Sequence, residues 1–106
     1  MTDLPVIEIA RIRVVPGRAE RFEAALREAA PLLLASPGCL GAEVYRTVEE
    51  PGEFRLVVRW RTVDDHRVGF QGSQAFRRWR ELLGPWFDGV PHVEHLVDGR
   101  ALDKPT

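Results

Sequence analysis

The sequence predicts one α+β domain in which four strands and two helices follow one another in the order β-α-β-β-α-β. Three observations lead to this prediction: strand-like segments near both ends of the chain, two central strands joined by a tight turn, and two stretches of helical periodicity. The chain has 106 residues, which is long enough for one domain and too short for two.

The first half of the chain contains one strand and one helix. Residues 6–15 are rich in β-branched residues and are expected to form a strand that Pro16-Gly17 ends. From Arg18 onward, apolar residues recur at helical spacing, namely Phe22, Leu26, Ala29 and Leu33. Pro31 lies inside this pattern and has no amide hydrogen, so we expect a kink or an early end of the helix there.

A hairpin is expected in the middle of the chain. Its strands are predicted at residues 39–48 and 54–61, and Glu49-Glu50-Pro51-Gly52 has the composition of the turn between them. The second strand alternates clearly, because one face carries only apolar residues: Phe54, Leu56, Val58 and Trp60.

A second helix and a last strand complete the order. Thr62-Val63-Asp64-Asp65 has a capping-box pattern that favours a helix start, and Gly69 and Gly72 weaken the helix that follows. Ser73 can start a second helical segment, which Gly84-Pro85 ends. The last strand is expected at residues 90–97.

This order of elements is that of the ferredoxin-like split βαβ fold. We expect an antiparallel four-stranded sheet with both helices on one face. The other face would mix apolar residues with Arg55, Arg59 and Arg61, which need neutralising partners such as Glu43. We therefore expect a homodimer through this face. The domain would span residues 6–97, followed by a polar C-terminal tail at residues 98–106.

Composition excludes several classes of partner. With 15 basic and 16 acidic residues the net charge is -1, which gives no reason to expect nucleic acid or an anionic membrane. Cys39 is the only cysteine, and the three histidines lack an organised carboxylate pattern, so we expect no metal. The N-terminus lacks the features of a signal peptide, and no apolar stretch reaches the ~18 residues of a membrane span. A cytoplasmic protein is the resulting expectation.

Four passages of the chain resemble the antibiotic biosynthesis monooxygenase (ABM) superfamily of dimeric ferredoxin-like domains, also described as dimeric alpha-beta barrels. These passages are Arg13-Val14-Val15-Pro16-Gly17-Arg18, Ser36-Pro37-Gly38-Cys39-Leu40, Trp60-Arg61-Thr62-Val63-Asp64-Asp65-His66 and Pro91-His92-Val93-Glu94-His95. Along the second helix, Phe70, Ser73, Phe76 and Trp79 follow the spacing of the family. The resemblance covers roughly residues 6 to 97.

The resemblance implies a cofactor-independent monooxygenase that oxidises a phenolic, quinol or anthrone-like metabolite with O2. It also implies a pocket between helices and sheet for a small hydrophobic or aromatic molecule. One branch of the family degrades haem, with an asparagine in the first strand and a tryptophan and a histidine in the second helix. The corresponding positions here hold Ala10, Phe70 and Arg80, so the resemblance argues against haem degradation.

His66 is the candidate catalytic residue. An imidazole with a pKa of about 6.5 can act as a general base near neutral pH, although a solvated histidine beside a helix start is the commoner case. The candidate substrate-binding residues are Trp60, Phe70, Phe76, Trp79 and His95. For the aromatic residues the alternative is an ordinary place in the core, and for His95 it is a role in the fold or the dimer contact.

Other functions stay open at this stage. The same fold could serve as a non-catalytic binding or accessory domain, or as a small-molecule isomerase or cyclase. Arg77, Arg78 and Arg80 form a basic run, but a short run in a chain of this net charge is typical of a solvated helix face.

Overall fold

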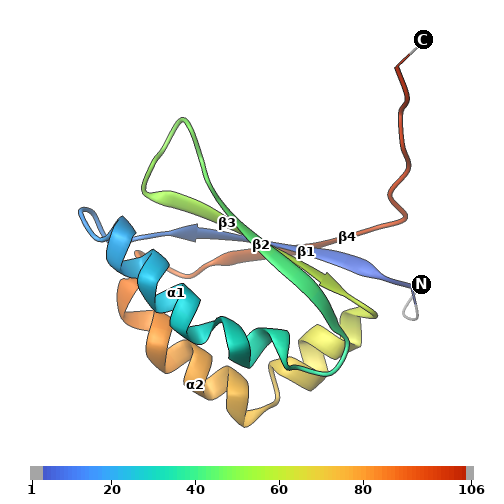
Figure 1. Cartoon of the computed structure of the whole chain (residues 1–106), viewed down its shortest axis with the longest axis horizontal. Coiled ribbons are helices and arrows are strands. Elements are labelled where there is room, and N and C mark those ends of the chain that lie inside the picture. The colour runs from blue at the N-terminus through green and yellow to red at the C-terminus, as the bar shows by residue number, and fades with distance from the viewer. Residues whose placement is uncertain (1–3, 105–106) are drawn as a thin grey trace.

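A computed structural model describes residues 4–104 and contains one four-stranded antiparallel sheet (Figure 1). The strands lie in the spatial order β2-β3-β1-β4, and their bounds are β1 (Val6–Arg13), β2 (Cys39–Arg46), β3 (Glu53–Trp60) and β4 (His92–Val97). Positions 1–3 of the N-terminal segment and positions 105 and 106 of the predicted tail lie outside the described residues.

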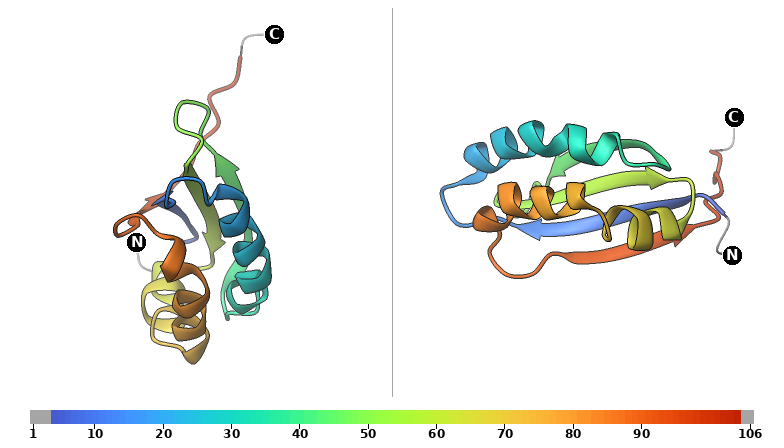
Figure 2. Two further views of the ribbon diagram at one scale, coloured as in Figure 1. Left: turned by 90° about the vertical axis from the view of Figure 1, so that its left-hand side faces the viewer. Right: turned by 90° about the horizontal axis from the view of Figure 1, so that it is seen from below.

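Both helices cover the same face of this sheet (Figure 2). They are α1 (Ala19–Leu34) and α2 (Gln74–Leu83), and a short 3-10 helix, η2 (Gly84–Trp86), follows α2. The predicted ferredoxin-like order and the placement of the helices are confirmed. Within residues 4–104, no helix is long and apolar enough to cross a membrane.

The core forms where the helices meet the inward-facing positions of the two central strands. From β1 these positions are Val6, Glu8, Ala10 and Ile12, and from β3 they are Phe54, Leu56, Val58 and Trp60. The predicted apolar stripe of α1 is buried against them, and the rings of Phe22 and Phe54 lie 4.9 Å apart between centroids. Glu8 is thus the one ionisable residue among eight inward positions of the central strands.

Of the two outcomes predicted at Pro31, a kink or an early end of the helix, the early end is wrong, because α1 continues for three more residues to Leu34. Pro31 lies on the exposed side of the helix. There, water can satisfy the carbonyl of Arg27, which loses its usual amide partner, so the proline is tolerated inside the helix.

The segment between β3 and α2 is helical but irregular. A π-helical turn, η1 (Asp65–Phe70), comes first, and the Thr62 hydroxyl accepts a hydrogen bond from the Asp65 amide at 3.1 Å. The Ser73 hydroxyl then accepts one from the Phe76 amide at 3.1 Å, which confirms that a second segment begins at Ser73. The irregular turn brings two of its residues, His66 and Phe70, into the interior.

A close approach at Gly38 fixes η1 beside the start of β2. Gly38 has a φ of +86°, and a Cβ atom at this position would overlap the side chain of Asp65. Its carbonyl also accepts a hydrogen bond from the Arg61 amide at 2.8 Å. Only glycine combines this positive φ with the lack of a Cβ atom, so no other residue fits here without strain.

Candidate active site

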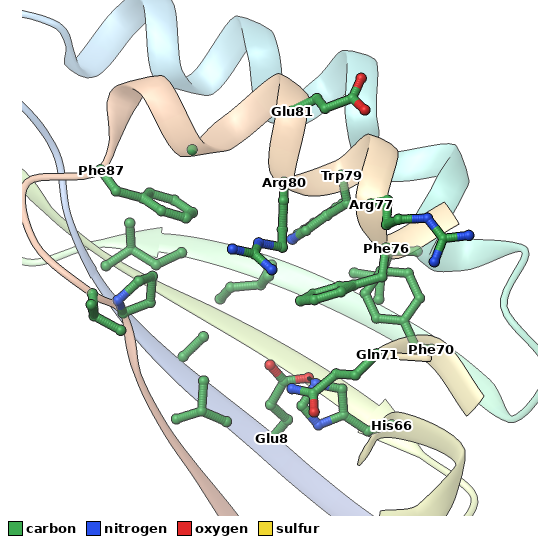
Figure 3. Close-up of a pocket in the computed structure, with 18 of the residues that line it drawn as sticks. Glu8, His66, Phe70, Gln71, Phe76, Arg77, Trp79, Arg80, Glu81 and Phe87 are labelled. Carbon is green, nitrogen blue, oxygen red and sulfur yellow. Dashed lines mark ion pairs between the residues drawn. The ribbon is translucent and has the colours of Figure 1, made fainter. Parts of the chain in front are cut away.

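A cavity of about 850 Å³ lies between the sheet and α2 (Figure 3). Its floor is formed by strands β1, β3 and β4, through Glu8, Ala10, Ile12, Leu56 and Val93. Its other walls include four aromatic side chains: Phe70, Phe76, Trp79 and Phe87. A cavity of this size, with aromatic walls and a few polar groups, can hold one small molecule.

Three of the sequence-predicted binding residues lie on the cavity wall. Phe70 comes from η1, whereas Phe76 and Trp79 come from α2. The ring of Phe70 meets the other two edge-on, with centroid distances of 5.3 Å to Phe76 and 5.8 Å to Trp79. This edge-to-face packing holds the wall in a fixed shape.

Trp60 and His95, the other two predicted binding residues, are not among the residues that line the cavity. Trp60 is fully buried on the helix side of the sheet, against His66 and Phe70, and its indole Nε1 donates a hydrogen bond to Glu8 Oε1 at 2.8 Å. His95 Nε2 lies 2.8 Å from His66 Nδ1. Both residues therefore support the groups that do reach the cavity.

The predicted catalytic residue, His66, lines the cavity and is only 3% exposed, so it is not the solvated residue of the alternative interpretation. Its ring stacks on Trp60 with a centroid distance of 5.2 Å. Its Nε2 lies 3.4 Å from Glu8 Oε1, and its Nδ1 faces His95. Both ring nitrogens are thus occupied by protein groups.

Glu8 is the ionisable group that sequence reasoning missed. Its side chain lines the cavity floor, although the residue is only 5% exposed. Oε1 receives both Trp60 and His66. The other oxygen, Oε2, has no hydrogen-bond partner among the described residues. Every fully buried side-chain oxygen or nitrogen in the described part of the chain has one, so Oε2 is not fully buried. It is accessible from the cavity that Glu8 lines.

The strand register explains why these groups meet. Glu8 of β1 pairs directly with His95 of β4 and with Val58 of β3. His66 reaches the same point from η1, above the sheet. The carboxylate, the two imidazoles and the indole therefore form one chain of contacts, Trp60–Glu8–His66–His95, which we call the Glu8 network.

Burial sets the ionisation of the Glu8 network. It raises the pKa of the Glu8 carboxyl from 4.5 to about 6, although the hydrogen bond from Trp60 acts in the opposite direction. Burial, with smaller contributions from the nearby His95 and Arg67, lowers the pKa of His66 from 6.5 to about 4. At pH 7 Glu8 is thus mainly ionised and His66 neutral, so their contact has the distance but not the charges of an ion pair.

These charges favour one arrangement of hydrogen atoms in the network. An ionised Glu8 favours the His66 tautomer that has its hydrogen on Nε2, facing Oε1 across 3.4 Å, and a lone pair on Nδ1. In this arrangement the donor of the 2.8 Å contact between the two imidazoles is His95 Nε2 and the acceptor is His66 Nδ1. If Glu8 takes up a proton, the same contacts can run in reverse, because each imidazole can exchange the roles of its two nitrogens.

The three positions compared with the haem-degrading branch all lie on the cavity wall. They are held by Ala10, Phe70 and Arg80, none of which carries an imidazole or an amide. Among residues 4–104, no group of three or more histidine, cysteine, aspartate or glutamate side chains is placed to hold a metal ion.

Comparison with known proteins gives consistent family and fold relationships. A family model described as antibiotic biosynthesis monooxygenase matches residues 5–82. The uncharacterized protein YczJ of Bacillus subtilis (strain 168) is 34% identical over 93 residues, which cover 88% of this chain and 98% of that protein.

Solved structures agree with this relationship. A Bordetella bronchiseptica protein named for the same family is 42% identical, with a TM-score of 0.86, and the match covers 92% of this chain and 98% of that one. A Caulobacter crescentus CB15 protein, 23% identical, has a TM-score of 0.80 over 93% of each chain, which shows the shared fold.

The raised pKa of Glu8 predicts a pH-dependent cost to folding. Because the pKa is about 6 in the folded chain and 4.5 otherwise, wild-type protein should lose roughly 2 kcal/mol of stability as pH rises through this interval. Glu8→Gln cannot ionise, so its free energy of unfolding relative to wild type should increase by roughly that amount between pH 4 and pH 7.5. Urea unfolding at both pH values and one protein concentration measures this difference.

Two features separate the effect of Glu8 ionisation from other effects on stability. The lowered pKa of His66 destabilises the fold as pH falls from 6.5 toward 4, but it does so in both proteins and cancels from the difference. Glu28→Gln, on the exposed side of α1, controls for the substitution itself. A relative stability of Glu8→Gln that is equal at both pH values would contradict the assigned ionisation.

Proposed function

The chain belongs to the antibiotic biosynthesis monooxygenase family, and from this premise we propose that it oxidises an electron-rich phenolic, quinol or anthrone-like metabolite with O2 and without a cofactor. One observation carries the proposal: a buried carboxylate, Glu8, presents a free oxygen to a cavity walled by aromatic rings. A flat aromatic molecule would lie against these rings, with its acidic hydrogen facing Glu8.

The proposed reaction needs no redox group from the protein, because the substrate is the reductant. Glu8 takes a proton from the substrate, and the resulting anion transfers one electron to O2. The two radicals combine to a peroxide, which recovers the proton and then loses water to leave a new carbonyl group. For a ring methylene, the sum is CH2 + O2 → C=O + H2O.

We assign the base to Glu8 and a positioning role to His66, which revises the choice made from the sequence. Both nitrogens of His66 already face protein groups, whereas Glu8 has an oxygen free. A pKa of about 6 also makes Glu8 ionised at pH 7 and still basic enough to accept a proton, while a pKa of about 4 makes His66 the weaker base.

His66 and His95 would serve the base in two ways. They fix the carboxylate in one orientation together with Trp60, and they offer a path along which its proton can move away from the cavity and return. His95 is partly exposed, so the outer end of this path can exchange protons with water.

Loss of the base provides the test of the proposed reaction. Purified protein should accelerate O2 uptake by a panel of anthrones and quinols, with one atom of ¹⁸O2 entering the product. Glu8→Gln should lower kcat by roughly 10²–10⁴-fold, as expected for loss of general base catalysis, and kcat/KM of wild type should fall below about pH 6.

Glu28→Gln is the matched control, because it removes an exposed carboxylate from α1 and should retain full activity. Rearrangement of a substrate without O2 uptake would instead indicate the isomerase alternative, which could use the same base. Binding without any turnover would favour an accessory domain. Undiminished O2 uptake by Glu8→Gln would exclude Glu8 as the base.

We also propose that the protein is a cytoplasmic homodimer that pairs through the uncovered face of its sheet. Ile7 of β1 and Leu96 of β4 are paired neighbours on this face and remain 39% and 48% exposed. The arginines there are partly neutralised within the chain, since Arg59 binds Glu43 with a shortest distance of 2.6 Å, as the sequence suggested. An apolar patch with internally paired charges is suited to association with a second copy.

The dimer proposal predicts a clear effect of charge on this patch. Ile7→Glu combined with Leu96→Glu should convert a dimer into a monomer in sedimentation velocity, because four carboxylates would have to be buried in the interface. Val68→Glu is the control, since Val68 is 67% exposed on η1, on the helix side of the sheet. A wild-type protein that sediments as a monomer would refute the proposal.

A further inference from the structure

Arg80 brings a positive charge to the cavity from the side opposite Glu8. In Figure 3 its side chain extends from α2 into the space above the sheet, between Phe87 and Phe76, whereas Arg77 and Glu81 point away from that space. Arg80 is both exposed and a lining residue, so it lies where the cavity opens to solvent.

The Arg80 guanidinium has no acidic partner within residues 4–104, unlike several other arginines of the chain. Its neighbour Arg78 binds Glu81 at 3.2 Å. Arg59 binds Glu43, and Arg61 binds Asp65. The one carboxylate on the cavity floor, Glu8, is engaged by Trp60 and His66 instead.

The position of Arg80 is set by an aromatic ring. Its guanidinium carbon lies 5.9 Å from the centre of the Phe76 ring, within the range of a cation–π contact. This contact leaves the donors of the guanidinium free, because a ring face uses none of them. The group is therefore held beside the cavity wall with its hydrogen-bonding capacity available.

We propose that Arg80 binds a carboxylate on the aromatic substrate, so that the natural substrate is an aromatic acid whose reactive hydrogen faces Glu8. This inference rests on the proposed function, since it names the substrate class of the same site. A guanidinium binds a carboxylate through two parallel hydrogen bonds, which a hydroxyl group cannot match. The ring would lie between the two charged ends, against Phe70, Phe76 and Trp79.

The arrangement also separates two acidic groups of the substrate. The carboxylate is already ionised in water and is drawn to Arg80 at the cavity opening. The weakly acidic phenol or methylene is then directed to the floor, where Glu8 is ionised and only 5% exposed. A carboxylate that entered in the opposite orientation would meet the like charge of Glu8.

A binding experiment tests this inference without requiring turnover. The probes are the 1-, 2- and 9-carboxylates of anthracene and the matching hydroxymethyl anthracenes, which have similar shapes but no charge. At pH 7.5 and low salt, at least one carboxylate should bind wild type about tenfold or more tightly than its alcohol, as measured by the anisotropy of the ligand fluorescence. Added salt should reduce this preference.

Substitutions then assign the preference to Arg80. Arg80→Gln should bind the carboxylate no more tightly than the alcohol, while its affinity for the alcohol stays within about twofold of wild type. Arg21→Gln makes the same change of net charge on an exposed position of α1 that does not line the cavity, and should keep the preference. An Arg80→Gln variant that retains the preference would overturn the inference.

The binding results distinguish a failure of the inference about Arg80 from a failure of the proposed aromatic site. If the alcohols bind wild type and no carboxylate is preferred, the inference about Arg80 is wrong and the aromatic site stands. If neither class of probe binds, the inference falls together with the aromatic site on which the proposed function depends.

Discussion

The burial of one carboxylate at an inward position of β1 is the constraint on which the rest of the site depends. An ionised side chain in a dry interior is costly unless donors surround it. Here the indole of Trp60 on β3 donates a hydrogen bond to Glu8, the imidazole of His66 on η1 lies 3.4 Å from the same oxygen, and His95 on β4 contacts His66. The π-helical turn, the stacked Trp60 and His66 rings and the pairing of β1 with β4 all contribute to holding Glu8 in place.

The buried carboxylate also gives the cavity two ends of opposite charge. One end has a carboxylate that is satisfied on Oε1 and open on Oε2, and the other end has the guanidinium of Arg80, with aromatic walls between them. Neither charge neutralises the other within the described residues. A ligand that is apolar in the middle, weakly acidic at one end and anionic at the other would complement this distribution better than a purely apolar molecule.

The fold was predictable because its signals are local. Alternation in β3 and the stripe of α1 depend on residues a few positions apart, and Ser73 marked the start of α2 correctly.

The site was less predictable. Glu8 was missed although its signal was present, since it lies on the same face of β1 as Val6, Ala10 and Ile12. The contact of His66 with His95 was not predictable, because it depends on the register of β4 against β1 and on an irregular turn. For the same reason Trp60 was expected on the wall, whereas it lies buried against His66 and does not line the cavity.

The central claim is that Glu8 removes a proton from a bound aromatic molecule, and hydrogen exchange under anaerobic conditions tests it most directly. Without O2, the reaction would stop after deprotonation, so wild-type protein in D2O should speed the exchange of deuterium into the acidic ring methylene of an anthrone. Glu8→Gln should reduce that acceleration by roughly 10²-fold or more. Equal exchange rates with wild type and Glu8→Gln, in the presence of demonstrated binding to both, would contradict the account.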